Sequence, residues 1–181
     1  RDPDALTSAE RRDIVGLFFS LNWDRIVAPN PRYAQLLAMR ESGERYAAQD
    51  LRDLQALFNL GWFGFAARRE RSDVRDLLAK GAGYTRDDIL QILTIQIDIV
   101  QRLSSRWRAL VENGQVELCV TPMYHPILPL LIDSESFREA MPDRDGPRPF
   151  RHRRDAEWHV DEGLRWAELT WHNRPRGCWP A

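Results

Sequence analysis

The segment from Gly114 to Asp133 constrains the fold of this chain more than any other part of the sequence. Polar and apolar residues alternate over 116–121, as in a β-strand with one apolar and one mixed polar face. Such a strand suits the wall of an α/β barrel, with helices packed outside and a functional lumen inside. The preceding Asn113 and Gly114 are typical of a helix end, and Pro122 ends the strand because proline has no N–H to donate. The apolar positions are Val116, Leu118 and Val120, and the polar positions are Glu117, Cys119 and Thr121.

Three polar side chains are predicted to reach one rim of this barrel. Tyr124 and His125 lie just past the carboxyl end of the strand that carries Glu117. In α/β barrels this rim holds the reacting groups. The alternative is a buried strand in which an arginine neutralises Glu117, followed by a proline-rich corner.

The rest of the chain is predicted to be mostly helical. Helix starts are indicated after the capping box at Thr7, after Pro31, at a cap on Asp50, and at Ser72. The longest helix begins at Thr85 and runs directly into the predicted strand, which makes a helix-then-strand unit of an α/β barrel. Its apolar stripe is expected to comprise Ile89, Leu93, Gln96, Val100, Leu103, Trp107 and Leu110.

The end of the chain combines an irregular segment with one more helix. Residues 134–154 are rich in proline and charge, and such a long excursion favours a wall of the substrate groove. Asp155 is predicted to cap a last helix that ends near Trp171. Its inward positions are Ala156, Val160, Leu164 and Ala167.

The composition narrows the possible partners. A formal net charge of −1 over 181 residues argues against nucleic acid or an anionic membrane as the main partner. No membrane span is indicated, because prolines interrupt the longest apolar stretch, which ends at Ile132. Two cysteines, Cys119 and Cys178, lack CxxC spacing and make no zinc site. They are expected to be free, buried thiols in a reducing, cytoplasmic compartment, and the oligomeric state stays open.

Three blocks of the sequence resemble glycoside hydrolase family 57. They are 114–117 together with 121–130, an upstream stretch at 51–62, and 177–181 at the end of the chain. The likeness covers roughly residues 45–181, and the blocks stand in the order that the family shows. It implies an α/β fold, part of a (β/α)₇ barrel of the glycoside hydrolase/deacetylase type that is helix-rich in this piece. Residues 1–181 would then be a partial catalytic barrel domain, incomplete at both ends.

The resemblance also implies a chemistry. Members of the family cleave or transfer α-1,4 and α-1,6 linkages of α-glucans with retention of configuration, without a cofactor or metal. The nucleophilic glutamate of the family is expected directly after Ala181, and its general acid lies in a later region. No catalytic residue is therefore expected in this chain, which should be inactive alone but contribute to binding an α-glucan or oligosaccharide.

The substrate-binding residues implied are Glu117, His125, Trp179 and Tyr124. Glu117 matches a conserved active-site glutamate of the family that is neither nucleophile nor acid. Trp179 matches a family tryptophan, and its indole can stack on a sugar ring; a core tryptophan is the alternative. His125 is interpreted either as a ligand of a sugar hydroxyl or as a capped rim histidine, and Tyr124 as a weaker contact.

Two other functions are compatible with the sequence. A metal-dependent hydrolase of the polysaccharide deacetylase type would use His152, His159, Asp155 and Asp161 as ligands, although no HxxxH pair exists. A non-catalytic module that binds glucan or completes the fold of a partner is the other alternative.

Overall fold

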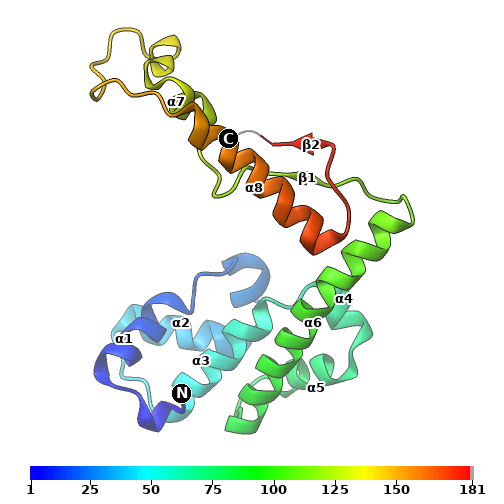
Figure 1. Cartoon of the computed structure of the whole chain (residues 1–181). Coiled ribbons are helices and arrows are strands. Elements are labelled where there is room, and N and C mark those ends of the chain that lie inside the picture. Colours follow the sequence, from blue (N-terminus) through cyan, green and yellow to red (C-terminus); the bar gives the residue numbers. More distant parts are fainter. Residues whose placement is uncertain (180–181) are drawn as a thin grey trace. The chain divides into compact units, whose positions relative to one another are not determined.

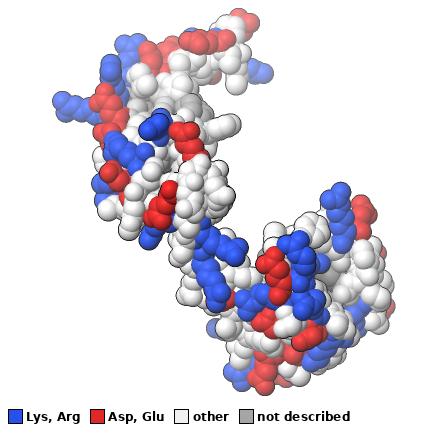
Figure 2. All heavy atoms as spheres, turned by 90° about the vertical axis from the view of Figure 1, so that its right-hand side faces the viewer, with Lys and Arg blue, Asp and Glu red and all other residues white. Residues whose placement is uncertain are grey.

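The computed structural model describes residues 1–179 (Figure 1). The chain divides into two compact units, of which the first is Arg1–Ile99 and the second begins at Val100. No helix in the described part of the chain is long and apolar enough to cross a membrane. On the face shown in Figure 2, acidic and basic side chains are interspersed on both units.

The first unit is entirely helical. Its elements are η1 (Pro3–Ala5), α1 (Ser8–Leu17), the π-helical turn η2 (Trp23–Val27), α2 (Pro31–Ser42), α3 (Ala48–Gly61), α4 (Phe65–Glu70), α5 (Ser72–Lys80) and most of α6 (Arg86–Glu112). The core surrounds α3, whose Leu51, Leu54 and Leu60 are at most 1% exposed. Each leucine buried in this way contributes roughly 1.5–3 kcal/mol to folding. The stacked rings of Phe18 and Phe58, 4.3 Å apart, join α1 to α3.

A buried carboxylate ties three elements of this unit together. Asp53 on α3 is 1% exposed and accepts hydrogen bonds from Arg32 Nε at 2.8 Å and from the Tyr84 backbone N–H at 2.9 Å. Gln49 Nε2 donates a third at 2.8 Å. These donors offset the cost of removing the charge from water.

The helix starts confirm most of the sequence predictions. Thr7 and Glu10 form the predicted capping box of α1, and α2 and α5 begin at Pro31 and Ser72. The prediction that Asp50 caps α3 is wrong, because the N-cap is Ala47. Asp50 instead lies at the third helical position and accepts the Ala47 N–H at 2.7 Å.

The predicted stripe of α6 is wrong in part, although its Ile89 packs against the core of the first unit. The fully buried residues are Ile92 and Ile95, whereas Leu93, Val100 and Trp107 are 39%, 63% and 41% exposed. Gln96, which belongs to the predicted stripe, contacts α3, since its Nε2 donates to the Asn59 carbonyl at 3.0 Å. Periodicity identifies an apolar face but not the part of it that a neighbouring helix covers.

The second unit contains a small parallel sheet. Its elements are the end of α6, β1 (Cys119–Val120), α7 (Leu128–Ile132), η3 (Ser134–Glu139), α8 (Arg153–Trp171) and β2 (Gly177–Cys178). Cys119 pairs with Gly177 and Val120 with Cys178, and α8 lies in the crossover between the two strands (Figure 1). A barrel is not visible among residues 1–179; the sheet described there has two strands.

The strand predicted over 116–121 is hydrogen-bonded only at Cys119 and Val120. Its alternation is nevertheless present, since the apolar positions are half-buried and Glu117, Cys119 and Thr121 are exposed. The hydrogen-bonded strand is short because its partner, β2, pairs with it over two residues.

The excursion after α7 is irregular, as predicted, apart from the short 3₁₀ helix η3. Its two ends are joined by hydrogen bonds from Ser134 N–H to the Phe150 carbonyl at 3.1 Å and from His152 N–H to the Leu131 carbonyl at 2.7 Å. The prediction that Asp155 caps the last helix is wrong: α8 begins at Arg153 after His152, and Asp155 lies in its first turn.

The two cysteines are free, but the expectation that they are buried is wrong, because both are exposed. The strand register places Cys119 opposite Gly177 and Cys178 opposite Val120, so the two thiols face opposite sides of the sheet. Gly177 allows the close approach of the strands, since a Cβ there would lie 2.7 Å from Cys119 Sγ.

Candidate functional site

The carboxyl ends of β1 and β2 meet at one edge because the strands are parallel. The Trp179 N–H donates to the Val120 carbonyl at 2.8 Å and so extends the pairing past β2. The segment 121–125 leaves β1 at the same edge. Tyr124, His125 and Trp179 therefore lie directly after one of these two strands, whereas Glu117 lies two residues before β1.

Glu117 and Trp179 belong to the same face of the sheet. Trp179 follows Gly177 by two residues, and Gly177 pairs with Cys119, which follows Glu117 by two. The Trp179 side chain is 67% exposed and Glu117 is exposed as well. Within residues 1–179, Glu117 has no ion pair, so the arginine that the alternative reading requires is not found there.

Tyr124 and His125 form a turn that α8 holds in place. The His125 N–H donates to the Pro122 carbonyl at 2.6 Å, and the Met123 N–H donates to the His159 carbonyl at 2.9 Å. The Nδ1 atom of His159 contacts the Met123 carbonyl as well. Both main-chain polar groups of Met123 are thus bonded to one residue of α8, which fixes the start of the turn.

Gly163 lets α8 approach this turn closely. A Cβ at Gly163 would lie 2.7 Å from the Thr121 carbonyl oxygen and 3.3 Å from the Met123 nitrogen. Both contacts are to backbone, which a side-chain rotation cannot relieve. A side chain at this position would therefore push the rim turn away from the helix.

An open cleft of about 440 Å³ lies between the rim turn and α8. Tyr124 and His125 line it from the turn, and Trp166 and Trp171 line it from the helix. Glu117 and Trp179 do not line it. The four predicted residues thus form two pairs, one on the sheet face and one in the cleft.

Trp166 and Trp171 were not identified from the sequence. Seven tryptophans are present, and their composition alone does not select these two. The sequence does contain one indication of where α8 packs. Gly163 and Ala167 are small and four residues apart, so they share the face of α8 that can approach a neighbouring segment most closely. Large aromatic residues beside such a face lie at the edge of the contact, where a cleft can form.

The ring of Trp166 is held by its own helix. The guanidinium of Arg165 lies over the indole, 5.5 Å from the ring centre. Arg165 Nε also donates to Glu162 Oε2 at 2.8 Å, and this hydrogen bond lowers the pKa of the Glu162 carboxyl. The carboxylate therefore orients the cation that covers part of the ring.

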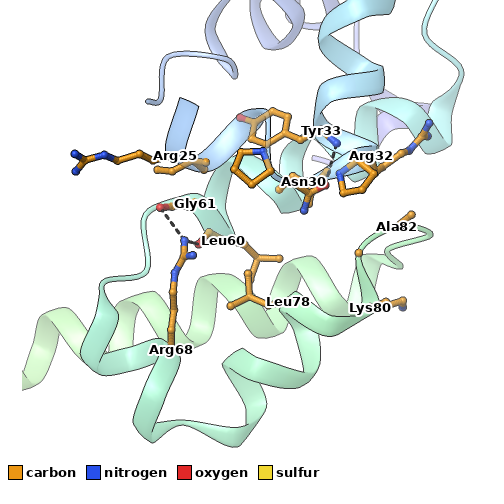
Figure 3. Close-up of a pocket in the computed structure, with 15 residues that line it drawn as sticks. Arg25, Asn30, Arg32, Tyr33, Leu60, Gly61, Arg68, Leu78, Lys80 and Ala82 are labelled. Atoms are coloured by element: carbon orange, nitrogen blue, oxygen red, sulfur yellow. Dashed lines mark hydrogen bonds between the residues drawn. The ribbon is translucent and has the colours of Figure 1, made fainter. Parts of the chain in front are cut away.

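The first unit has a cleft of its own, of about 560 Å³ (Figure 3). Leu60 and Leu78 point into it, and Arg68 turns back to donate to the Gly61 carbonyl at 3.3 Å. The basic residues Arg32 and Lys80 at its edge are already paired with aspartates. None of the predicted site residues lies there, so this cleft is not the candidate site.

The residues proposed as metal ligands do not gather in the part of the chain that is described. No group of three or more His, Cys, Asp or Glu side chains there is arranged to hold a metal ion. The imidazole of His159 is instead directed to the Met123 carbonyl.

A parallel strand–helix–strand unit with polar and aromatic residues at its carboxyl edge is typical of α/β enzymes. The family model described as Glycosyl hydrolase family 57 matches residues 20–181. The chain belongs to glycoside hydrolase family 57, which confirms the resemblance seen in its three sequence blocks and extends it well before residue 45. No curated protein and no solved structure matches the chain significantly.

Proposed function

We propose that residues 1–181 belong to the (β/α)₇-barrel catalytic domain of a retaining glycoside hydrolase or transglycosidase that acts on α-glucans. Family membership supports the reaction class. The observation that carries the placement of the site is the parallel pairing of β1 and β2, which gives Glu117 and Trp179 a common face. Sugar rings would lie along this face of the sheet.

In the proposed reaction the chain supplies binding groups. Retaining glycosidases use a nucleophilic carboxylate and an acid about 5–5.5 Å apart. The proposal assigns neither of these to a residue of this chain. Glu117 would instead accept hydrogen bonds from sugar hydroxyls, and its charge would raise the pKa of a nearby carboxylic acid.

The aromatic residues and the histidine would orient the sugar. The exposed indole of Trp179 offers a flat apolar surface to the C–H groups of a pyranose ring, with a polar N–H at its edge. His125 and Tyr124 would hydrogen-bond to hydroxyls from the rim turn. We also propose a cytoplasmic location, because the exposed free thiols Cys119 and Cys178 fit a reducing compartment.

The test is the binding of linear glucans to the purified protein, measured by titration calorimetry. Maltoheptaose is expected to bind and cellohexaose to bind far more weakly. Glu117→Gln keeps the shape but removes the charge, and hydrogen bonds to charged groups contribute about 1.5–3 kcal/mol. The variant should therefore lose at least about tenfold in affinity for maltoheptaose.

The matched control is Glu139→Gln, which removes an exposed carboxylate from η3 in the same unit. It should bind maltoheptaose as the unsubstituted protein does. A folded protein that binds neither oligosaccharide would contradict the proposed function. Unchanged affinity in Glu117→Gln would remove Glu117 from the site.

A further inference from the structure

We infer that the cleft between the rim turn and α8 is a second sugar-binding subsite, with Trp166 and Trp171 as its aromatic surfaces. This inference rests on the proposed function and adds residues that lie outside the sheet face of Glu117 and Trp179. The ligand is one glucosyl unit of an α-glucan chain.

The size and lining of the cleft suit a pyranose ring. Its volume of about 440 Å³ lies within the range of ligand pockets, roughly 300–1,000 Å³. Aromatic side chains border it on two sides, Tyr124 from the turn and the two tryptophans from the helix. Such a lining with a few polar groups is the usual composition of a small-molecule site.

The polar groups of the cleft match the needs of a sugar. The imidazole of His125 can donate to or accept from a hydroxyl, and Thr170 and Thr121 also line the space. The aromatic rings face the apolar C–H groups of the sugar, and the hydroxyls at the ring edge meet these polar groups.

The openness of the cleft indicates a polymer rather than a free monosaccharide. Tyr124 is 80% exposed and Trp166 is 48% exposed, so neither residue closes the space. A chain can enter and leave along the surface without a conformational change. The cleft lies at the carboxyl end of β1, the edge at which Trp179 also lies.

The cleft is organised before any ligand binds. His159 bonds both main-chain groups of Met123, and Gly163 brings α8 against the turn. Arg165, oriented by Glu162, lies over the Trp166 ring. Because the turn and the Trp166 ring already have these contacts, stacking on Trp166 costs less entropy than stacking on a free side chain.

The experiment measures maltoheptaose affinity by titration calorimetry on the whole chain. Trp166→Ala and Trp171→Ala should each weaken binding about tenfold, the upper range for a lost aromatic contact. Trp166→Phe and Trp171→Phe keep a flat ring and should recover most of the affinity. Thermal unfolding monitored by circular dichroism establishes that each variant is folded.

The matched control is Leu169→Ala. Leu169 lies on the same helix, is 58% exposed and does not line the cleft, so its removal should leave affinity unchanged. An equal loss in Leu169→Ala would show a general effect on α8 and overturn the subsite.

The failure of this inference differs from the failure of the proposed function. If Glu117→Gln weakens binding while folded Trp166→Ala and Trp171→Ala bind normally, the subsite is wrong and the proposed function stands. If the unsubstituted protein binds no maltoheptaose, both are wrong.

Discussion

At the scale of single residues, a glycine shapes the candidate site more than any charged group does. Gly163 is buried and faces the backbone of the rim turn, so its missing side chain sets the distance between α8 and β1. Glu117, in contrast, is exposed and has no ion pair in residues 1–179. The sequence predicted Glu117 as a binding residue, whereas the importance of Gly163 for the spacing of α8 and the rim turn is seen only in the structure.

The substitution Gly163→Ala tests this role. The new Cβ would lie 2.7 Å from the Thr121 carbonyl oxygen, and overpacking of this kind typically costs about 1–3 kcal/mol. We expect a lower free energy of unfolding in urea and weaker binding of maltoheptaose.

The control for this change is Gly16→Ala on α1. A Cβ at Gly16 meets no atom within 4 Å, and alanine is the better helix former, so the protein should be stabilised by up to about 1 kcal/mol. A Gly163→Ala protein as stable as the Gly16→Ala protein would show that the helix and the turn adjust freely.

At the scale of elements, the helices of the first unit were largely predictable because their ends carry local signals. The capping box at Thr7 and the start at Pro31 were both confirmed. The helix α4 was missed because it has no side-chain cap and no buried residue, so neither end signals nor periodicity mark it. The buried residues of α6 were assigned incorrectly in part, because which positions are covered depends on how far the neighbouring helices extend along it.

An ion-pair triad between α5 and α6 makes the stability of these elements dependent on pH. Arg71 binds Asp73 on α5 at 2.8 Å and Asp98 on α6 at 2.7 Å. The hydrogen bonds from Arg71 lower the pKa of Asp73 below its ordinary value of 3.8. A carboxyl with a lowered folded-state pKa stabilises the fold at pH values above its unfolded pKa, and this contribution is lost as pH falls through the folded pKa.

We therefore expect the unfolding free energy to fall as the pH drops below about 4. Other carboxyls contribute to this fall, so the informative quantity is the difference between the protein and Arg71→Gln. The difference should be largest at neutral pH and shrink toward pH 2. Urea titrations across this range measure it, and a difference that stays constant with pH would contradict the assignment.

At the scale of the whole molecule, the two units differ in how much apolar surface they bury. The continuous core of buried side chains, from Ile14 to Ile95, belongs to the first unit. In the described part of the second unit the buried apolar side chains are those of Ala156, Ala167, Pro122 and Pro175, all of them small. Local opening should therefore require less free energy in the second unit.

Hydrogen exchange measured by mass spectrometry should show this difference. Amides of α3 are expected to exchange most slowly, and amides of α7 and of residues 140–152 most rapidly. Protection of α8 comparable to that of α3 would mean that the second unit is more stable than its burial indicates. Adding maltoheptaose should slow exchange in the rim turn and in α8.

The candidate site was predictable from the sequence only where it follows the strand pattern. The alternation over 116–121 and the proline at Pro122 locate the rim, and family 57 is recognisable from local blocks. The cleft was not predictable, because it depends on α8, which returns to the rim about forty residues later along the chain. Which of its tryptophans meet Tyr124 is decided by helix packing rather than by local pattern.

Because the two thiols point in opposite directions, each face of the two-stranded sheet carries one cysteine that a reagent can label. A reagent attached at Cys119 would stand on the side shared with Glu117 and Trp179, whereas the same reagent at Cys178 would stand on the reverse. If one cysteine at a time is replaced by serine, a bulky maleimide attached to the other blocks access to one face of the sheet only. The two sides of this ribbon can thus be told apart by labelling chemistry alone.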